Sequence, residues 1–190
     1  MNKVVIVTGG GRGIGAATSK LLAAQGYLVC VNYRADTKSA AATVNAITAS
    51  GGKAFSLQAD VSIEKDVISL FETTEITFGP VTHLVNNAGI LFPQSSFADI
   101  DVARFHQIMT GNVTSCFLCA REFIKRSKSA GAIVNVSSAA ARTGAPFEYI
   151  DYAATKGAMD TLTKGLSLEV AAQGIRVNSV RPGFIYTQNH

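Results

Sequence analysis

Short apolar segments alternate along the chain with longer segments of helical pattern, and this alternation restricts the fold more than any other feature of the sequence. The apolar segments are rich in β-branched residues and rarely alternate with polar ones, as expected of strands that are covered on both faces. We predict strands at 4–8, 28–33, 54–58, 82–86, 132–137 and 175–180, and helices at 14–25, 37–49, 64–78, 102–125 and 152–172. This order predicts an α/β fold in three layers, a doubly wound parallel sheet of Rossmann type, in a single domain over residues 1–190.

Composition and charge bound the class of protein. Of 190 residues, 47% are hydrophobic and 16% are charged, which indicates a globular domain rather than a disordered chain. The net charge is +4, but the basic residues are scattered. The densest group is Arg121, Lys125, Arg126 and Lys128, near the end of a predicted helix, where cations favour the negative end of the helix dipole. We therefore expect a solvated helix end and no nucleic-acid partner.

Neither a membrane segment nor a metal centre is expected. No apolar run is long enough to cross a bilayer, and the apolar residues before the first glycines are too few for a signal peptide. We therefore expect a cytoplasmic protein without a membrane partner. Cys116 and Cys119 have the spacing of a redox or zinc pair, but they lie in an apolar helical stretch without a second pair or a nearby histidine. With Cys30, they are predicted to be small buried residues, and no metal site is expected.

A glycine-rich turn lies between the first predicted strand and the first predicted helix. It carries Gly9, Arg12, Gly13, Ile14 and Gly15. Because glycine has no side chain, the backbone of such a turn can approach a pyrophosphate closely. The helix that begins near Ile14 offers unpaired N–H groups and the positive end of its dipole to the phosphates. The sequence therefore predicts a dinucleotide-binding turn.

Three side chains in the second half of the chain can move a proton. Tyr152 and Lys156 lie four residues apart and share one face of a predicted helix. A nearby ammonium lowers the pKa of a phenol, which would let Tyr152 act as a general acid/base. Ser138 ends a predicted strand, at the edge where open α/β sheets bind ligands, and offers a hydroxyl to a carbonyl or alkoxide. The side chain of Ser137 is expected to point to the opposite face.

In this order, the glycine turn, the segment Asn86-Asn87-Ala88-Gly89, Ser138 and Tyr152-x-x-x-Lys156 resemble the classical short-chain dehydrogenase/reductase family. Among its members, 3-oxoacyl-acyl-carrier-protein reductases and glucose 1-dehydrogenases are the nearest in type. The resemblance implies four catalytic residues, Asn112, Ser138, Tyr152 and Lys156. In such a site the tyrosine is the general acid/base, the serine orients the substrate, and the asparagine holds a water. The lysine lowers the pKa of the tyrosine and binds the nicotinamide ribose.

The expected cofactor-binding residues extend over most of the chain. By resemblance, Asp60 and Val61 contact the adenine ring, Ala88 and Gly89 let the backbone approach the cofactor, and Thr187 meets the carboxamide. The full set is Gly9, Arg12, Gly13, Ile14, Gly15, Arg34, Asp60, Val61, Asn87, Ala88, Gly89, Tyr152, Lys156, Pro182, Gly183 and Thr187.

The end of the second predicted strand bears on the choice between NADP and NAD. An acidic residue there would accept hydrogen bonds from the ribose 2′-OH and repel a 2′-phosphate. Tyr33 occupies that position here, Arg34 follows it, and Arg12 lies in the glycine turn. Two guanidiniums suit a phosphate dianion, so we predict NADP, with NAD as the alternative. Asp36, close by in sequence, weakens this argument.

The resemblance implies an alcohol dehydrogenase or carbonyl reductase, which acts on a small-molecule alcohol or carbonyl and assembles as a homotetramer or homodimer. Members of the family continue past this point with a substrate lid, a further helix and a last strand, so we expect the full protein to extend beyond His190. Three alternatives stay open: a non-catalytic dinucleotide-binding sensor, an inactive truncation and, from charge alone, a nucleic-acid binder. The substrate and the direction of the reaction are not predicted.

Overall fold

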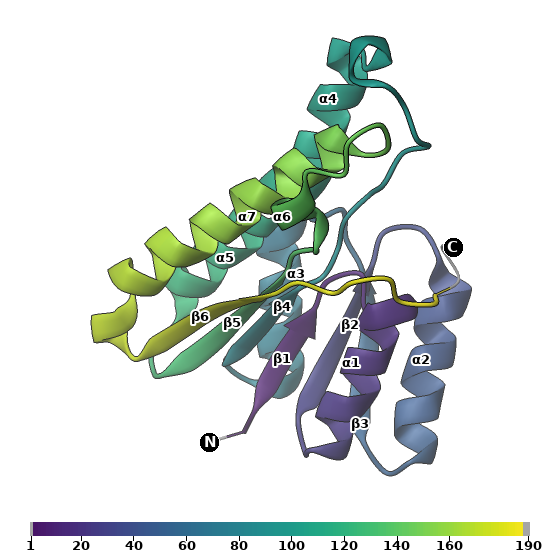
Figure 1. The fold of residues 1–190 in the computed structure, drawn as a ribbon. Coiled ribbons are helices and arrows are strands. Elements are labelled where there is room, and N and C mark those ends of the chain that lie inside the picture. Colours follow the sequence, from purple (N-terminus) through teal and green to yellow (C-terminus); the bar gives the residue numbers. More distant parts are fainter. Residues whose placement is uncertain (1, 188–190) are drawn as a thin grey trace.

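A six-stranded, fully parallel sheet forms the centre of the protein (Figure 1), in a computed structural model that describes residues 2–187. Its strands follow the order β3-β2-β1-β4-β5-β6. They are β1 (Val4–Val7), β2 (Leu28–Tyr33), β3 (Lys53–Gln58), β4 (His83–Asn86), β5 (Gly131–Val136) and β6 (Ile175–Val180). The strand order reverses between β1 and β4, which is the topological switch point of a doubly wound fold. The predicted fold class is confirmed.

Helices cover both faces of the sheet and make the three layers. They are α1 (Gly13–Ala24), α2 (Thr37–Ala49), α3 (Glu64–Phe78), α4 (Val102–Met109), α5 (Ser115–Arg126), α6 (Ala140–Thr143) and α7 (Ile150–Glu169). One apolar cluster joins the sheet to α1 and α2 through Ala23, Ala40 and Ile47. A second cluster joins the other face to α3 and α5, where Phe71 and Phe123 are fully buried. Figure 1 shows α7 beside α5 on this second side.

Two helical segments end at glycine. Gly26 follows α1 with φ +81°, and Gly174 follows the short 3-10 turn Ala171–Gln173 with φ +73°. Both backbones are left-handed, a conformation that glycine adopts without the cost that a Cβ would add. The short helix α6 and the 3-10 turn Phe97–Asp99 were not predicted, because each lasts only a few residues.

The chain is helical over the whole predicted range 102–125, but it is not α-helical throughout. A π-helical turn, Thr110–Thr114, separates α4 from α5. Ser115 Oγ donates to the backbone oxygens of Gly111 and Asn112, and Gly111 is itself a weak helix former. The extra residue of a π-turn rotates one side chain out of the α-helical register, and such turns are frequent at functional sites. Here the turn contains Asn112, whose side chain is fully buried.

Candidate active site

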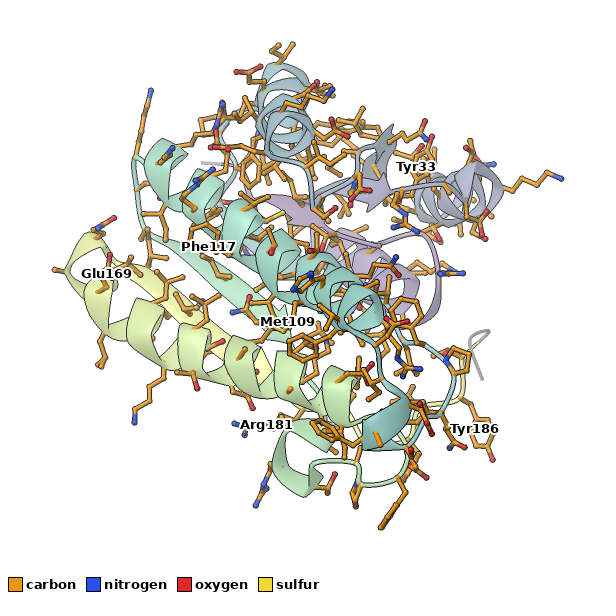
Figure 2. All side chains as sticks on the ribbon, turned by 90° about the horizontal axis from the view of Figure 1, so that it is seen from above. Tyr33, Met109, Phe117, Glu169, Arg181 and Tyr186 are labelled. Atoms are coloured by element: carbon orange, nitrogen blue, oxygen red, sulfur yellow. The ribbon has the colours of Figure 1, made fainter. Side chains whose placement is uncertain are left out.

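The predicted site residues gather along the carboxyl edge of the sheet. Figure 2 looks onto this edge and labels Tyr33, at the end of β2, and Tyr186, in the segment after β6. After β6, the chain runs back across the edge toward α1 and α2 (Figure 1). The backbone beyond Pro182 thereby reaches the glycine turn, since a Cβ on Gly13 would lie 3.4 Å from Cγ2 of Thr187. Residues from both ends of the chain therefore border one site.

At Gly11 and Gly15 the glycine turn is packed too closely for side chains. A Cβ on Gly15 would lie 2.3 Å from the backbone oxygen of Gly9, and one on Gly11 would lie 3.0 Å from the backbone of Ala40. Gly9 and Gly13 have φ of +60° and +51°. Helix α1 then begins at Gly13 with neither a side-chain cap nor an acidic residue in its first turn. A turn that excludes side chains, followed by an uncapped helix N-terminus, fits a dinucleotide pyrophosphate.

Asn87 holds the glycine turn in place. Its Nδ2 donates to the backbone oxygens of Thr8 and Gly9, at 3.0 and 3.1 Å. The hydroxyl of Thr8 in turn accepts the backbone N–H groups of Asn87 and Ala88, both at 3.0 Å. The segment after β4 is therefore tied to the segment after β1 across the switch point. Asn87 was predicted to bind cofactor, and its side-chain amide bonds to the glycine turn itself.

Cations surround the position predicted for the cofactor's 2′ group. Arg12 and Arg34 are both exposed, and Arg12 lies close enough to Asp36 to help lower the pKa of that carboxyl. Hydrogen bonds from the backbone and hydroxyl of Ser39 dominate that lowering, because Asp36 caps α2. The carboxylate of Asp36, which weakened the NADP prediction, is therefore engaged as the N-cap of α2. A cavity of about 550 Å³ between Arg34 and Ile90 opens beside these residues.

Asp60 and Val61 lie after β3 with their side chains already in contact with protein. The carboxylate of Asp60 accepts from the backbone and hydroxyl of Ser62, at 3.0 and 2.6 Å. Val61 is buried in the core cluster. The contact with adenine that the resemblance implies for these two residues stays a prediction.

Tyr152 and Ser138 face one another. The hydroxyl of Ser138 interacts with the phenol of Tyr152 and also accepts the backbone N–H of Ala140 at 3.1 Å. Burial raises the pKa of Tyr152, and the bond to Ser138 opposes this rise. The direction is opposite to the lowering that we expected from the lysine. The phenol of Tyr152 is therefore protonated at neutral pH.

Lys156 is buried beside the tyrosine. The residue is only 3% exposed, and its Nζ lies 5.4 Å from the centre of the Tyr152 ring. Nζ donates to the backbone oxygen of Val136 at 2.8 Å. Burial lowers the pKa of the ammonium to about 8. Ser137 is also buried, and its hydroxyl donates to the backbone oxygen of Lys156, so Ser138 is the serine that faces the phenol.

Asn112 joins the long helix to the segment after β4. Its Oδ1 accepts the backbone N–H of Ile90 at 2.6 Å, while its Nδ2 donates to the Ile90 oxygen and to Thr155 Oγ1, both at 3.1 Å. A Cβ on Gly89 would lie 3.1 Å from Asn112 Oδ1 and 3.7 Å from Lys156 Nζ. The structure thus brings Asn112, Gly89 and Lys156 together, and the π-turn is what aims the asparagine at them.

Sequence reasoning missed a buried ion pair next to the tyrosine. Arg104 on α4 donates through Nε to Asp151 Oδ2 at 2.7 Å, and the Asp151 side chain is 1% exposed. Asp151 Oδ1 also accepts the backbone N–H of Tyr152 at 2.9 Å. The pair therefore ties α4 to the start of α7. Charged residues 47 positions apart give no local signal of such pairing.

We expect Arg104→Met to lower the free energy of unfolding by about 3 kcal/mol, because it leaves a buried carboxylate unpaired. The double variant Arg104→Met/Asp151→Asn should recover most of that loss, since the asparagine keeps the acceptor for Tyr152. Urea unfolding measures all three free energies. Arg121→Met, which breaks a half-exposed pair with Glu64, should cost no more than about 1 kcal/mol. A double variant no more stable than Arg104→Met would contradict the coupling.

The cysteines are buried and free, as predicted. Cys30, Cys116 and Cys119 are free thiols, and burial raises the pKa of Cys30 and of Cys116 to about 12. Within residues 2–187, no group of three histidine, cysteine or acidic side chains is placed to hold a metal ion. Over the same range, no helix is both long and apolar enough to cross a bilayer.

Comparison with known proteins shows which family the chain matches and which proteins it is similar to. Residues 3–190 match the family described as short chain dehydrogenase. The chain is 56% identical to the uncharacterized oxidoreductase YgfF of Escherichia coli K12, over 98% of this chain and 78% of that protein. It is 37% identical to a 3-oxoacyl-[acyl-carrier-protein] reductase of Synechocystis, over 97% of this chain and 75% of that protein. A short chain dehydrogenase from Burkholderia cenocepacia, solved in complex with NADP, superposes with a TM-score of 0.91 at 35% identity, over 98% of this chain and 76% of that one.

These findings and the site define an α/β oxidoreductase with a site for a nicotinamide dinucleotide. The chain belongs to the short-chain dehydrogenase/reductase family, as the resemblance predicted.

Proposed function

We propose that the protein interconverts an alcohol and a carbonyl, with NADP as the preferred cofactor. The observation that carries this proposal is the meeting of Ser138, Tyr152 and Lys156 at the carboxyl edge of the sheet, beside the turn of Gly9 to Gly15. A sensor that only binds a dinucleotide has no need of a phenol, a hydroxyl and a buried ammonium in contact. Asn112 completes the four catalytic residues of the proposal.

Each catalytic side chain has a distinct task in carbonyl reduction. When bound, the nicotinamide supplies the hydride in this direction and accepts it in the reverse. Ser138 holds the carbonyl oxygen, and the phenol of Tyr152 gives that oxygen its proton as negative charge develops. The ammonium of Lys156 lies beside the phenol and stabilises the phenolate that remains. Because burial raises the pKa of Tyr152, the phenol is protonated at neutral pH, the form that can donate a proton to the carbonyl oxygen.

The remaining predicted residues would hold the cofactor along the same edge. The glycine turn and the N-terminus of α1 suit the pyrophosphate, and Ala88, Gly89, Pro182, Gly183 and Thr187 border the nicotinamide end. Arg12 and Arg34 suit the 2′-phosphate, because Asp36 is occupied by Ser39 and competes for them only weakly. The NADP bound by the Burkholderia relative is consistent with this choice.

Calorimetric titration with NADPH and NADH tests the cofactor proposal. We expect NADPH to bind more tightly, and Arg34→Glu to weaken NADPH binding by about 10- to 100-fold, the loss of one charge-assisted contact plus repulsion. NADH binding should change by less than about threefold, because the substitution touches only the 2′ end. Tighter NADH binding to the unaltered protein would overturn the preference. Failure to bind either dinucleotide would overturn the oxidoreductase proposal for this chain.

The proposal extends to assembly. Apolar side chains are exposed on α4, α5 and α7, where Val102, Phe117 and Leu168 are 69%, 45% and 75% exposed. We infer that these helices contact a second subunit in a homotetramer or a homodimer, as the resemblance to the family implies. The cytoplasmic location stays a prediction.

A further inference from the structure

Asp160 lies on α7 one turn beyond Lys156, outside the set of residues that the sequence predicted. Its two carboxylate oxygens are both used: Oδ1 accepts from Ser179 Oγ at 2.9 Å, and Oδ2 accepts from Arg181 Nε at 2.7 Å. The hydroxyl of Ser137 also lies against it. The carboxylate is largely buried, with 15% of its side chain exposed.

Two partners of Asp160, Ser137 and Arg181, each adjoin a residue of the proposed site. Ser137 precedes Ser138, and its backbone N–H donates to the oxygen of Val180 at 2.8 Å. Arg181 directly precedes Pro182, whose oxygen accepts the N–H of Ala139 at 2.9 Å. Asp160 therefore connects the end of β5, the end of β6 and the helix of Lys156 through one side chain.

Asp160 and Lys156 lie four residues apart on α7, so both side chains start from one face of the helix, and the carboxylate favours the charged form of the lysine. The groups that face the ammonium are the Val136 oxygen, the Met159 sulfur, the Tyr152 ring, the Cys116 thiol from α5 and the Asp160 carboxylate. Burial raises the pKa of the thiol to about 12, so it is neutral near pH 7. Although burial opposes it, hydrogen bonds from Arg181, Ser179 and Ser137 lower the pKa of Asp160, which is therefore ionised. Asp160 is thus the permanent negative charge near a buried cation.

We propose that Asp160 is a positioning residue for Lys156: its carboxylate keeps the buried lysine protonated, and its bond to Arg181 holds the start of the Pro182–Gly183 segment against the site. Arg181 is the counter-charge that moderates this effect. The inference rests on the proposed function, because Lys156, the residue that the pair of Asp160 and Arg181 would position, is the one that binds the cofactor and stabilises the phenolate in that proposal.

Two substitutions should move the titration of Lys156 in opposite directions. Asp160→Asn removes a negative charge, so the ammonium is less stable and its midpoint should fall by about one pH unit. Arg181→Gln removes a positive charge beside the carboxylate, so the midpoint should rise. NMR of isotope-labelled lysine, with Lys156→Arg to assign the signal, follows the midpoint without any cofactor. As the pH is raised, calorimetry should show that NADPH binding begins to weaken at a lower pH in Asp160→Asn than in the unaltered protein.

Glu169→Gln is the matched control, because it removes the same charge from the exposed far end of α7, where Figure 2 labels Glu169. It should leave the midpoint unchanged. A damaged fold would shift or broaden many lysine signals together, whereas the proposal requires opposite shifts of one. Equal midpoints in all variants, or shifts of the same sign for Asp160→Asn and Arg181→Gln, would overturn it. The NMR result decides the inference even if NADPH does not bind, an outcome that would instead overturn the proposed function.

Discussion

Replacing Tyr152 by phenylalanine should lower turnover of a carbonyl substrate by about 10²- to 10⁴-fold, the usual contribution of a positioned general acid. The substitution removes one oxygen and leaves the ring, so the half-buried packing and the contact with Lys156 are retained. NADPH affinity should therefore change by less than about threefold. Steady-state rates with NADPH and calorimetric binding measure the two effects separately.

A matched control lies at the other edge of the sheet. Tyr27 packs edge to face against His83, with ring centres 4.9 Å apart, at the start of β2. Tyr27→Phe removes the same oxygen far from the carboxyl edge and should leave the turnover unchanged. If Tyr152→Phe keeps more than about a tenth of the activity, Tyr152 is not the general acid. If both variants lose activity together with thermal stability, the loss reflects the fold rather than the proton.

The fold was predictable because its signals are local. β1 reads Val-Val-Ile-Val, and all four residues are fully buried, so an unbroken apolar run correctly indicated a strand covered on both faces. Gly26 and Gly174, which end helical segments, have the left-handed backbone that suits glycine to this position. The glycine turn, likewise, is defined by consecutive residues between a strand and a helix. In each case the residues that carry the signal are near neighbours in the chain.

What the sequence concealed depends on residues that meet only in the fold. The π-turn at Thr110–Thr114 is stabilised by Asn112 bonding to Ile90, 22 residues away, whereas the local pattern reads as one continuous helix. Asp151 and Asp160 look like ordinary surface residues of a helix, yet both are paired with arginines from other elements. The pKa of Tyr152 was predicted in the wrong direction, because spacing indicates a nearby lysine but not the extent of burial.

Gly15→Ala should abolish most dinucleotide binding, and it tests the other half of the site. The new Cβ would lie 2.3 Å from the Gly9 oxygen and 2.6 Å from Asn87 Nδ2, so either the turn or the amide that holds it must move. Overpacking of this kind costs about 1–3 kcal/mol of stability. Displacement of the turn should also weaken NADPH binding by about 100-fold or more, equivalent to about 2.8 kcal/mol. Calorimetry and urea unfolding measure the two losses, and Ala17→Ser, on the exposed face of the same helix, should cause neither.

Gly13→Ala separates the binding loss from the loss of stability. Its Cβ would meet only Thr187, at 3.4 Å or more, so the packing cost is small and the main cost is the left-handed backbone at φ +51°, about 1 kcal/mol. That methyl would nevertheless lie on the glycine turn, which the proposal assigns to the pyrophosphate. NADPH binding should therefore fall by at least about tenfold while the protein stays folded. If Gly13→Ala binds NADPH normally, the pyrophosphate does not lie against Gly13, and the assignment of this part of the turn is wrong.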